Sequence, residues 1–187
     1  MAINRLNPDY PDAGLVQLVP TSIAVGSGSG SVNGNGTVDF SGVSTVSLNG
    51  VFTSTYTHYL IRTEVRNSTQ ADIALRLRVS GTDSSANYAQ GRYYVGETAS
   101  IAAGSTNNST GLSGITTGTY GTERGSFTIQ ISNPFETQHT SWTVIATGAY
   151  FQIIGATHQA ATSYDGFSLI SDAPNMTGQV SIYGYRK

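Results

Sequence analysis

Apolar residues at every second position dominate this sequence, and no window repeats with the 3.6-residue period of a helix. In the clearest stretch, residues 57–66, Tyr59, Ile61 and Val65 fall on one side of an extended chain and Arg62 on the other. Successive side chains of a β-strand point to opposite faces of its sheet, so this pattern predicts a strand with one buried face. The chain is therefore constrained to pair strands around a core that they share.

Other segments repeat the pattern and give the expected fold class. Two alternating runs, 57–66 and 73–79, are separated by the polar residues 67–70, a spacing that predicts a β-hairpin. Further runs lie at 127–131, 142–146, 151–154, 167–169 and 180–185, separated by Gly, Asn, Ser and Asp clusters. Short strands at this spacing are typical of a β-sandwich or a β-barrel. Of the two we expect the first: an all-β fold with a single antiparallel β-sandwich, jelly-roll-like, and an extended N-terminal arm.

Composition excludes several classes of partner. Only 11% of the 187 residues are charged, the formal net charge is -2, and the few basic residues are scattered, so we expect no nucleic-acid binding. No apolar run approaches the roughly 20 residues of a membrane span, and polar residues follow Met1, so we expect a soluble chain made without a secretory signal. The absence of cysteine excludes disulfides and thiol chemistry.

The N-terminal part differs in composition from the rest. Residues 26–36 read GSGSGSVNGNG, which is typical of a flexible linker, so we expect residues 1–36 to form an arm and linker and residues 37–187 the β-sandwich domain. The arm has one short apolar run, and we expect it to anchor the chain to a partner. Its alternatives are a frayed terminus or a first edge strand. The candidate anchoring residues are Leu15, Val16, Leu18 and Val19.

A tyrosine cluster is the candidate contact surface. Tyr88, Tyr93 and Tyr94 lie beside Arg92, and Tyr and Arg are enriched where proteins meet partners. The alternative is that these rings complete the core and keep their hydroxyls in water. The Gly-, Ser-, Thr- and Asn-rich stretch 102–121 is expected to be a long exposed loop beside them.

Motifs for catalysis or metal binding are missing from the sequence. The three histidines, His58, His139 and His158, are far apart and form no ligand pair. Asp165-Gly166 is a turn signal. The sequence has no G-x-S-x-G motif of a nucleophilic serine, and nothing in it singles out two carboxylates as a pair. We expect no enzyme, no metal and no cofactor. A glycan-degrading domain would need two carboxylates about 5 to 9.5 Å apart.

Several sequence segments, taken together, resemble those of small β-rich structural proteins of tailed bacteriophages. Members of this group are labelled variously as minor tail, fibre or capsid-associated proteins. The resemblance extends over nearly the whole chain from Leu18. The matching segments are residues 18–30, 40–52, 76–78, 81–83, 133–135, 162–167 and 178–187. The resemblance implies a virion component made in the host bacterial cytoplasm, with no catalytic residues to transfer.

The resemblance leaves the part of the particle open. Because the chain is short and has one domain, whereas fibres usually carry longer shafts, we expect a capsid decoration or cement protein that is anchored by its N-terminal arm. Its partners would be other virion proteins, either the major capsid protein or tail proteins, and further copies of itself, as a trimer. The alternative is a carbohydrate- or receptor-binding module of a tail fibre or minor tail protein. In that case Tyr88, Arg92, Tyr93, Tyr94 and residues 102–121 would contact a host glycan.

Overall fold

The computed structural model describes residues 14–96, 100–117, 124–148, 150–173 and 175–186. Within them the chain forms sixteen β-strands, and every strand pair is antiparallel. The described residues contain no helix with the length and apolarity needed to cross a bilayer.

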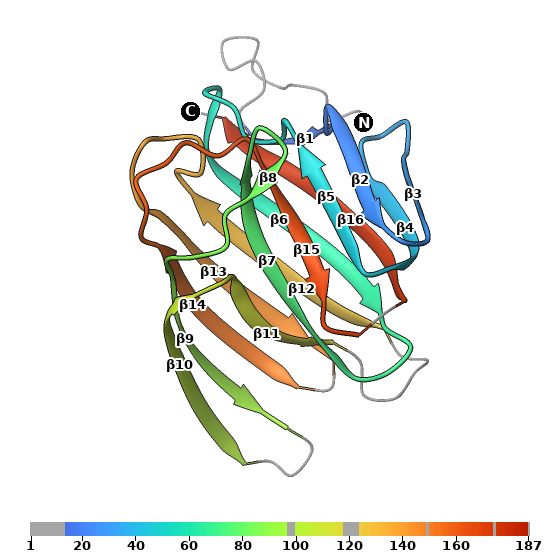
Figure 1. Cartoon of the computed structure of the whole chain (residues 1–187), viewed down its shortest axis with the longest axis vertical. Coiled ribbons are helices and arrows are strands. Elements are labelled where there is room, and N and C mark those ends of the chain that lie inside the picture. The colour runs from blue at the N-terminus through green and yellow to red at the C-terminus, as the bar shows by residue number, and fades with distance from the viewer. Residues whose placement is uncertain (1–13, 97–99, 118–123, 149, 174, 187) are drawn as a thin grey trace, which may run out of the picture.

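The strands form two sheets (Figure 1). The ten-stranded sheet has the order β10 (Ile101–Ser109), β9 (Tyr88–Val95), β14 (Phe151–His158), β13 (Thr140–Thr147), β12 (Gly125–Ser132), β6 (Tyr56–Arg66), β16 (Met176–Arg186), β4 (Val38–Val43) and β3 (Ser29–Val32), and β1 (Leu15–Leu18) pairs with β16. The six-stranded sheet has the order β11 (Leu112–Thr117), β7 (Ala71–Val79), β15 (Gly166–Ser171), β5 (Thr45–Asn49) and β2 (Ser22–Gly26), and β8 (Thr82–Asp83) pairs with β7.

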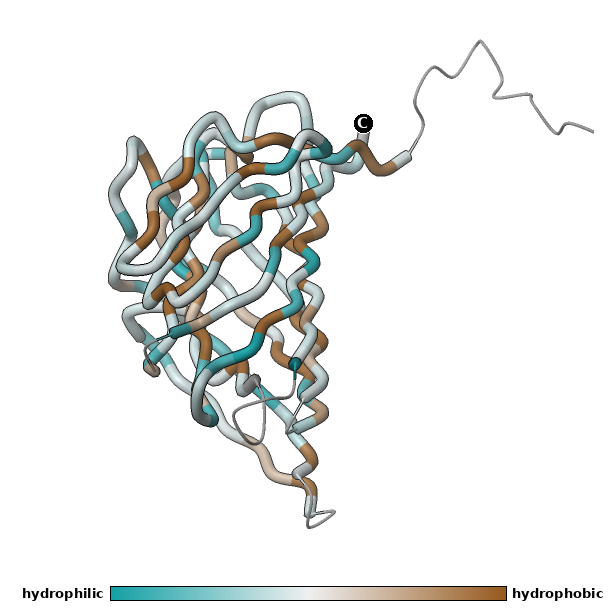
Figure 2. The backbone as a smooth tube through the Cα atoms, turned by 90° about the vertical axis from the view of Figure 1, so that its right-hand side faces the viewer, coloured by the Kyte–Doolittle hydropathy of each residue, from teal (hydrophilic) through white to brown (hydrophobic). Residues whose placement is uncertain are grey.

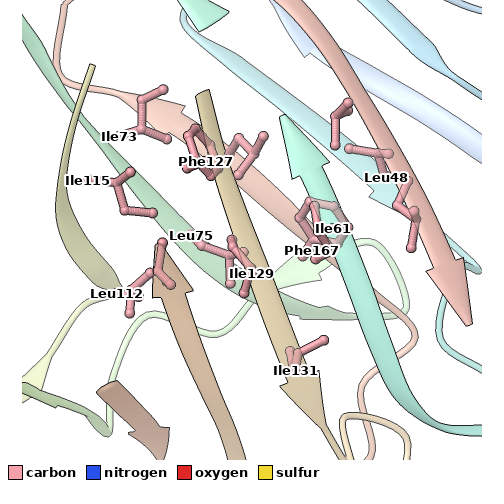
Figure 3. Close-up of a cluster of buried hydrophobic side chains, with 14 of the residues drawn as sticks. Leu48, Ile61, Ile73, Leu75, Leu112, Ile115, Phe127, Ile129, Ile131 and Phe167 are labelled. Atoms are coloured by element: carbon pink, nitrogen blue, oxygen red, sulfur yellow. The ribbon is translucent and has the colours of Figure 1, made fainter. Parts of the chain in front are cut away.

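The two sheets pack face to face around one apolar core (Figures 2 and 3). In the ten-stranded sheet β6 turns Tyr59, Ile61 and Val65 inward, and all three are fully buried. In the opposite sheet Leu75 and Leu77 of β7 are equally buried. Alternation along each strand thus supplies one apolar face per sheet. The expected all-β, jelly-roll-like antiparallel sandwich is confirmed.

The predicted hairpin of residues 57–66 and 73–79 is wrong. β6 pairs with β12 and β16 in one sheet, while β7 pairs with β15 and β11 in the other. Residues 67–70 therefore cross from sheet to sheet instead of closing a hairpin. The side chain of Asn67 is buried in this crossing, where the Ser171 hydroxyl donates a hydrogen bond of 3.2 Å to its Oδ1.

The structure also differs from the expected arm and linker. β1 and β3 lie in the ten-stranded sheet and β2 in the six-stranded sheet, so the sandwich includes residues 15–36. The glycines of this segment serve turns and close packing. Ser27 and Gly28 both have positive φ in the two-residue turn between β2 and β3, and a Cβ on Gly30 would lie 2.8 Å from Val25 Cγ1. Residues 1–13 of the expected arm lie outside the described residues.

The expected loop 102–121 is mostly strand. Residues 101–109 form the edge strand β10, and residues 112–117 form β11 at the edge of the other sheet. Residues 118–121 lie outside the described part of the chain. The small polar residues suited a loop by composition, but β10 is an exposed edge strand, where few large apolar side chains are needed. β11 is different, because Leu112 and Ile115 are fully buried in the core.

The sandwich has two distinct ends. β1 and the end of β16 lie at one end, and β9 and β10 extend to the opposite end (Figure 1). Figure 2 shows the ten-stranded sheet edge-on as the right-hand wall, which continues below the six-stranded layer and tapers. At that lower end the inner face of the large sheet passes beyond the opposite layer. The candidate site lies there.

Candidate functional site

A polar groove lies where the six-stranded sheet ends at β11. Its volume is about 300 Å³, and it is lined by Gln70, Ala71, Asp72, Arg92, Tyr94, Thr116, Tyr150, Gln152 and Asp172. A second hollow of about 150 Å³ shares Asp72 and Arg92 with it and extends toward β10. Residues from β7, β9, β11 and β14 thus meet in one groove, although Ala71 and Gln152 lie 81 positions apart in sequence.

Alternation along β9 points two of its side chains, Arg92 and Tyr94, into this groove. Arg92 and Tyr94 point to the same face as the buried Tyr88 and Gln90, while Tyr93 points to the opposite face and is 66% exposed. Near Tyr88 the inner face is covered by the other sheet. Beyond Gln90 that cover ends, so the side chains that follow on the same face reach open space.

Two glutamines hold β11, the strand that forms one wall of the groove. Gln90 of β9 donates to Ser113 O and accepts from Ser113 N, both at 2.9 Å. Gln152 of β14 accepts from Thr116 N at 2.9 Å and donates to Gly114 O at 3.0 Å. β11 pairs with β7 along one edge, and the two amides bind backbone groups on its other side. These bonds give partners to backbone N–H and C=O groups of β11 that would otherwise be buried without any.

The groove carries charges of both signs. Arg92 Nη1 donates to Gly114 O at 3.2 Å, and a Cβ on Gly114, where φ is +77°, would lie 1.9 Å from that nitrogen. A side chain at position 114 would displace the guanidinium group from this position, and the positive φ also favours glycine. Asp72 Oδ1 accepts from the Thr116 hydroxyl at 2.6 Å, and Asp172 Oδ1 accepts from Asp72 N at 2.8 Å. The ion pairs among the described residues are Arg78–Asp83 and Arg124–Glu64, so Arg92 and Asp72 line the groove without pairing to each other.

Two tyrosines stand beside these charges. The rings of Tyr94 and Tyr150 meet edge to face with centroids 5.7 Å apart, and the guanidinium carbon of Arg92 lies 5.2 Å from the Tyr94 centroid. These contacts limit the rotation of the rings and of the guanidinium group. The groove therefore offers fixed ring surfaces together with hydrogen-bond donors and acceptors.

The structure separates the four residues of the expected contact surface. Arg92 and Tyr94 line the groove, and Tyr93 lies on the opposite face of the sheet. The expectation for Tyr88 was wrong: it is fully buried, and its hydroxyl accepts from Leu77 N at 2.8 Å and donates to Ser84 O at 3.1 Å. Burial raises the pKa of Tyr88 well above its ordinary value. Sequence reasoning missed Asp72, Thr116, Tyr150, Gln152 and Asp172, which carry no motif.

The expected anchoring residues divide in the same way. Val16 and Leu18 of β1 are half-buried and pack against the core, whereas Leu15 and Val19 are 47% and 58% exposed. Leu15 is the register partner of Tyr185 in β16, which is 36% exposed. Leu15 and Tyr185 thus form an exposed apolar pair near the end of the sandwich opposite the groove, and the exposed Val19 follows four residues after Leu15.

Several of the sequence segments that carry the phage resemblance have structural roles. Arg78 is buried, forms an ion pair with Asp83, donates to Gly81 O, and bonds the Ser47 and Ser168 hydroxyls at 3.0 and 2.8 Å. This network joins β5, β7, β8 and β15. In the Asp165-Gly166 turn, Asp165 O accepts from both Val51 N and Phe52 N. These positions hold the fold and do not reach the groove.

Two of the three histidines form hydrogen bonds with serine hydroxyls. His158 is fully buried, its Nε2 lies 3.0 Å from Ser84 Oγ, and its ring meets Tyr88 and Tyr164 edge to face. Burial lowers its pKa below the ordinary value. His58 is exposed and bonds Ser132 at 2.9 Å. In the described part of the chain, no three His, Asp or Glu side chains gather as a metal site would require.

Comparisons with known proteins give only loose likenesses in structure. No family model and no curated protein matches the sequence. Among solved structures, arcelin-5, a lectin-like defense protein from Phaseolus vulgaris, is 8% identical over 88% of this chain and 93% of its own, with a TM-score of 0.36. A seed lectin of Lotus tetragonolobus is 10% identical over 89% and 94%, with a TM-score of 0.37. The binding domain of botulinum neurotoxin serotype G is 10% identical over 94% of this chain and 44% of its own, with a TM-score of 0.27. Similarities this loose carry no argument about function.

Proposed function

We propose that this chain is a structural protein of a bacteriophage virion, of the capsid decoration or cement type, and that it acts without catalysis. The proposal takes the phage resemblance of the sequence together with one observation: the exposed apolar side chains of Leu15, Val19 and Tyr185 lie on β1, just after it and on the end of β16, at the end of the sandwich opposite the groove. A protein displayed on a particle needs one end for attachment and can present the other.

The attachment end has the chemistry of a docking surface. Leu15, Val19 and Tyr185 expose apolar surface that a partner protein would remove from water, which stabilises an interface by roughly 25 cal/mol per Å² buried. Tyrosine is also enriched in such interfaces. The partner that we propose is another virion protein, the major capsid protein in preference to a tail protein. The chain would be made in the host cytoplasm and end in the particle.

Incorporation into particles tests this proposal. Phages that encode the double variant Leu15→Ser with Val19→Ser are expected to lose the protein from purified particles, as quantified by mass spectrometry. Val79→Ser serves as the matched control, because Val79 is an exposed valine (39%) on the other sheet. Immunogold labelling of wild-type particles should mark the icosahedral shell. Absence of the chain from purified particles contradicts the proposal.

The groove supports a second candidate function, binding of a host glycan. A sugar presents hydroxyl groups that both donate and accept hydrogen bonds, and its C–H faces pack on aromatic rings. The groove offers Arg92 as a donor, Asp72 as an acceptor, and the rings of Tyr94 and Tyr150. Its volume of about 300 Å³ suits one or two sugar rings.

A glycan array followed by calorimetry tests this second function. Arg92→Ala and Tyr94→Ala should each weaken the best-bound glycan about tenfold, which corresponds to about 1.4 kcal/mol. Tyr183→Ala is the matched control, because Tyr183 is a half-buried tyrosine on the outer face of the ten-stranded sheet, away from the groove. Binding that is absent across the array, or that all three variants retain, would refute a glycan site in the groove.

A further inference from the structure

Half of the large exposed apolar side chains of the described residues lie on one face. Tyr93, Ile101, Ile145, Phe151 and Ile153 are 66%, 78%, 51%, 49% and 43% exposed. All five belong to β9, β10, β13 and β14, the end of the ten-stranded sheet that carries the groove on its inner side. We name the outer side of these four strands the outer apolar face.

Strand register shows that these side chains form continuous rows. Ile145 pairs with Ile153, and Ile153 pairs with Tyr93, which in turn pairs with Ala103. Residues paired directly across antiparallel strands point to the same face. This row therefore crosses all four strands without interruption.

A second row lies one step along the strands. Phe151 pairs with Val95, and Val95 pairs with Ile101. The two rows are adjacent, because Phe151 and Ile153 are two residues apart on β14 and share one face. The outer apolar face is thus a contiguous patch rather than a scatter of single exposed side chains.

The outer apolar face carries no charge. The residues of β9, β10, β13 and β14 that share it are Ile, Val, Tyr, Phe, Ala, Gly, Ser and Thr, without Asp, Glu, Lys or Arg. The charged residues on this side of the sheet lie on other strands, among them Arg62 and Glu64 on β6 and Asp39 on β4. A partner for the outer apolar face therefore needs apolar surface and no complementary charge. The same face on a second copy meets that requirement.

The area of the face is sufficient for a pair of copies. The five exposed side chains leave roughly 550 Å² in contact with water, from about 150 to 250 Å² for each whole side chain of this size. Complete burial of these side chains in two copies would remove about 1,100 Å² from water, which is just above the roughly 1,000 Å² that an interface needs and is in the range of weak complexes. Sheets pack face to face readily, at a spacing of about 10 Å.

We propose that two copies of this chain associate through their outer apolar faces, around a two-fold axis, into a sheet-on-sheet dimer. A two-fold interface brings the same patch of each copy together, so one uncharged and contiguous face is enough. This dimer takes the place of the trimer expected from the sequence. It leaves the groove accessible, because the groove opens on the inner side of the sheet. The inference does not depend on the proposed virion function.

Sedimentation equilibrium of the full chain tests the dimer. The wild type is expected to be a dimer at micromolar concentration, and Ile153→Glu and Tyr93→Glu are expected to be monomers, because each would place a charge in the middle of the face. Val79→Glu, at an exposed valine of the other sheet, should remain a dimer. Circular dichroism and thermal melting establish that each variant is folded.

Three results would overturn the proposal. The first is a wild-type monomer up to 100-fold higher concentration, which would leave the face to a different protein. The second is a dimer that persists when the folded variants Ile153→Glu and Tyr93→Glu are measured. Dissociation of the dimer by the control Val79→Glu would count equally against the proposal. The third is a species of another size, because one flat face on each chain pairs two copies only. Loss of the chain from particles with an intact dimer in solution would count against the proposed function alone.

Discussion

Replacement of Gln152 by methionine tests how the groove wall is held. Gln152 is 1% exposed, and its amide accepts from Thr116 N at 2.9 Å and donates to Gly114 O at 3.0 Å. Methionine has a similar size and no polar group that can replace these bonds. Gly114 O keeps its bond from Arg92, but the Thr116 N–H loses its partner in a buried position.

The magnitude follows from these bonds. A buried donor left without a partner costs about 1 to 3 kcal/mol, and the lost bond to Gly114 adds about 1 kcal/mol, so the free energy of unfolding should fall by about 3 kcal/mol. For a domain of this size that lowers Tm by roughly 6 to 12 °C. The effect should also loosen β11 and, with it, the wall of the groove.

Differential scanning calorimetry measures this change, and a matched control is available on the same sheet. Gln130 lies on the exposed face of β12, so Gln130→Met should leave Tm within about 1 °C of the wild type. Equal Tm values for Gln152→Met and Gln130→Met would refute the reasoning that buried amides hold the edge of β11.

Two further predictions concern stability elsewhere. His158 has a pKa lowered by burial, so the unfolded chain binds more protons than the folded chain just below the ordinary value of 6.5. Stability should therefore fall as the pH drops through 6.5, and urea unfolding at pH 7.5 and 5.5 should show a smaller fall in His158→Gln than in the wild type or in the control His58→Gln. Gly178→Ala would place a Cβ 2.1 Å from Glu64 O, so it should destabilise the protein by about 2 kcal/mol or more. Gly155→Ala meets no atom within 4 Å and should change stability by less than about 1 kcal/mol, and equal melting temperatures of the two alanine variants would contradict the close approach at Gly178.

The strands could be predicted from the sequence, but their neighbours could not. The alternation in β6 and β7 showed which side chains would be buried, and the structure buries Ile61 and Leu75 accordingly. A strand with one apolar face fits either sheet of a sandwich equally well. Pairing partners depend on the whole topology, and the short connection at 67–70 favoured a hairpin that does not form.

The contact surface shows a similar limit. Tyr88 and Tyr94 have the same parity on one strand, so the sequence places them on the same face. One is core and the other lines the groove because the six-stranded sheet ends between them, which depends on residues far away in the sequence. Gln152 and Asp72 had no signal that could have found them, since an isolated polar residue in a strand is usually exposed.

Cryo-electron microscopy of purified particles of the phage that, on this proposal, carries the chain tests the central proposal most directly. We expect density for the sandwich on the icosahedral shell, with the end that carries Leu15, Val19 and Tyr185 against the major capsid protein and the β9–β10 end pointing outward. Density only at the tail, density in the reverse orientation, or no density for this chain on any part of the particle would contradict the account.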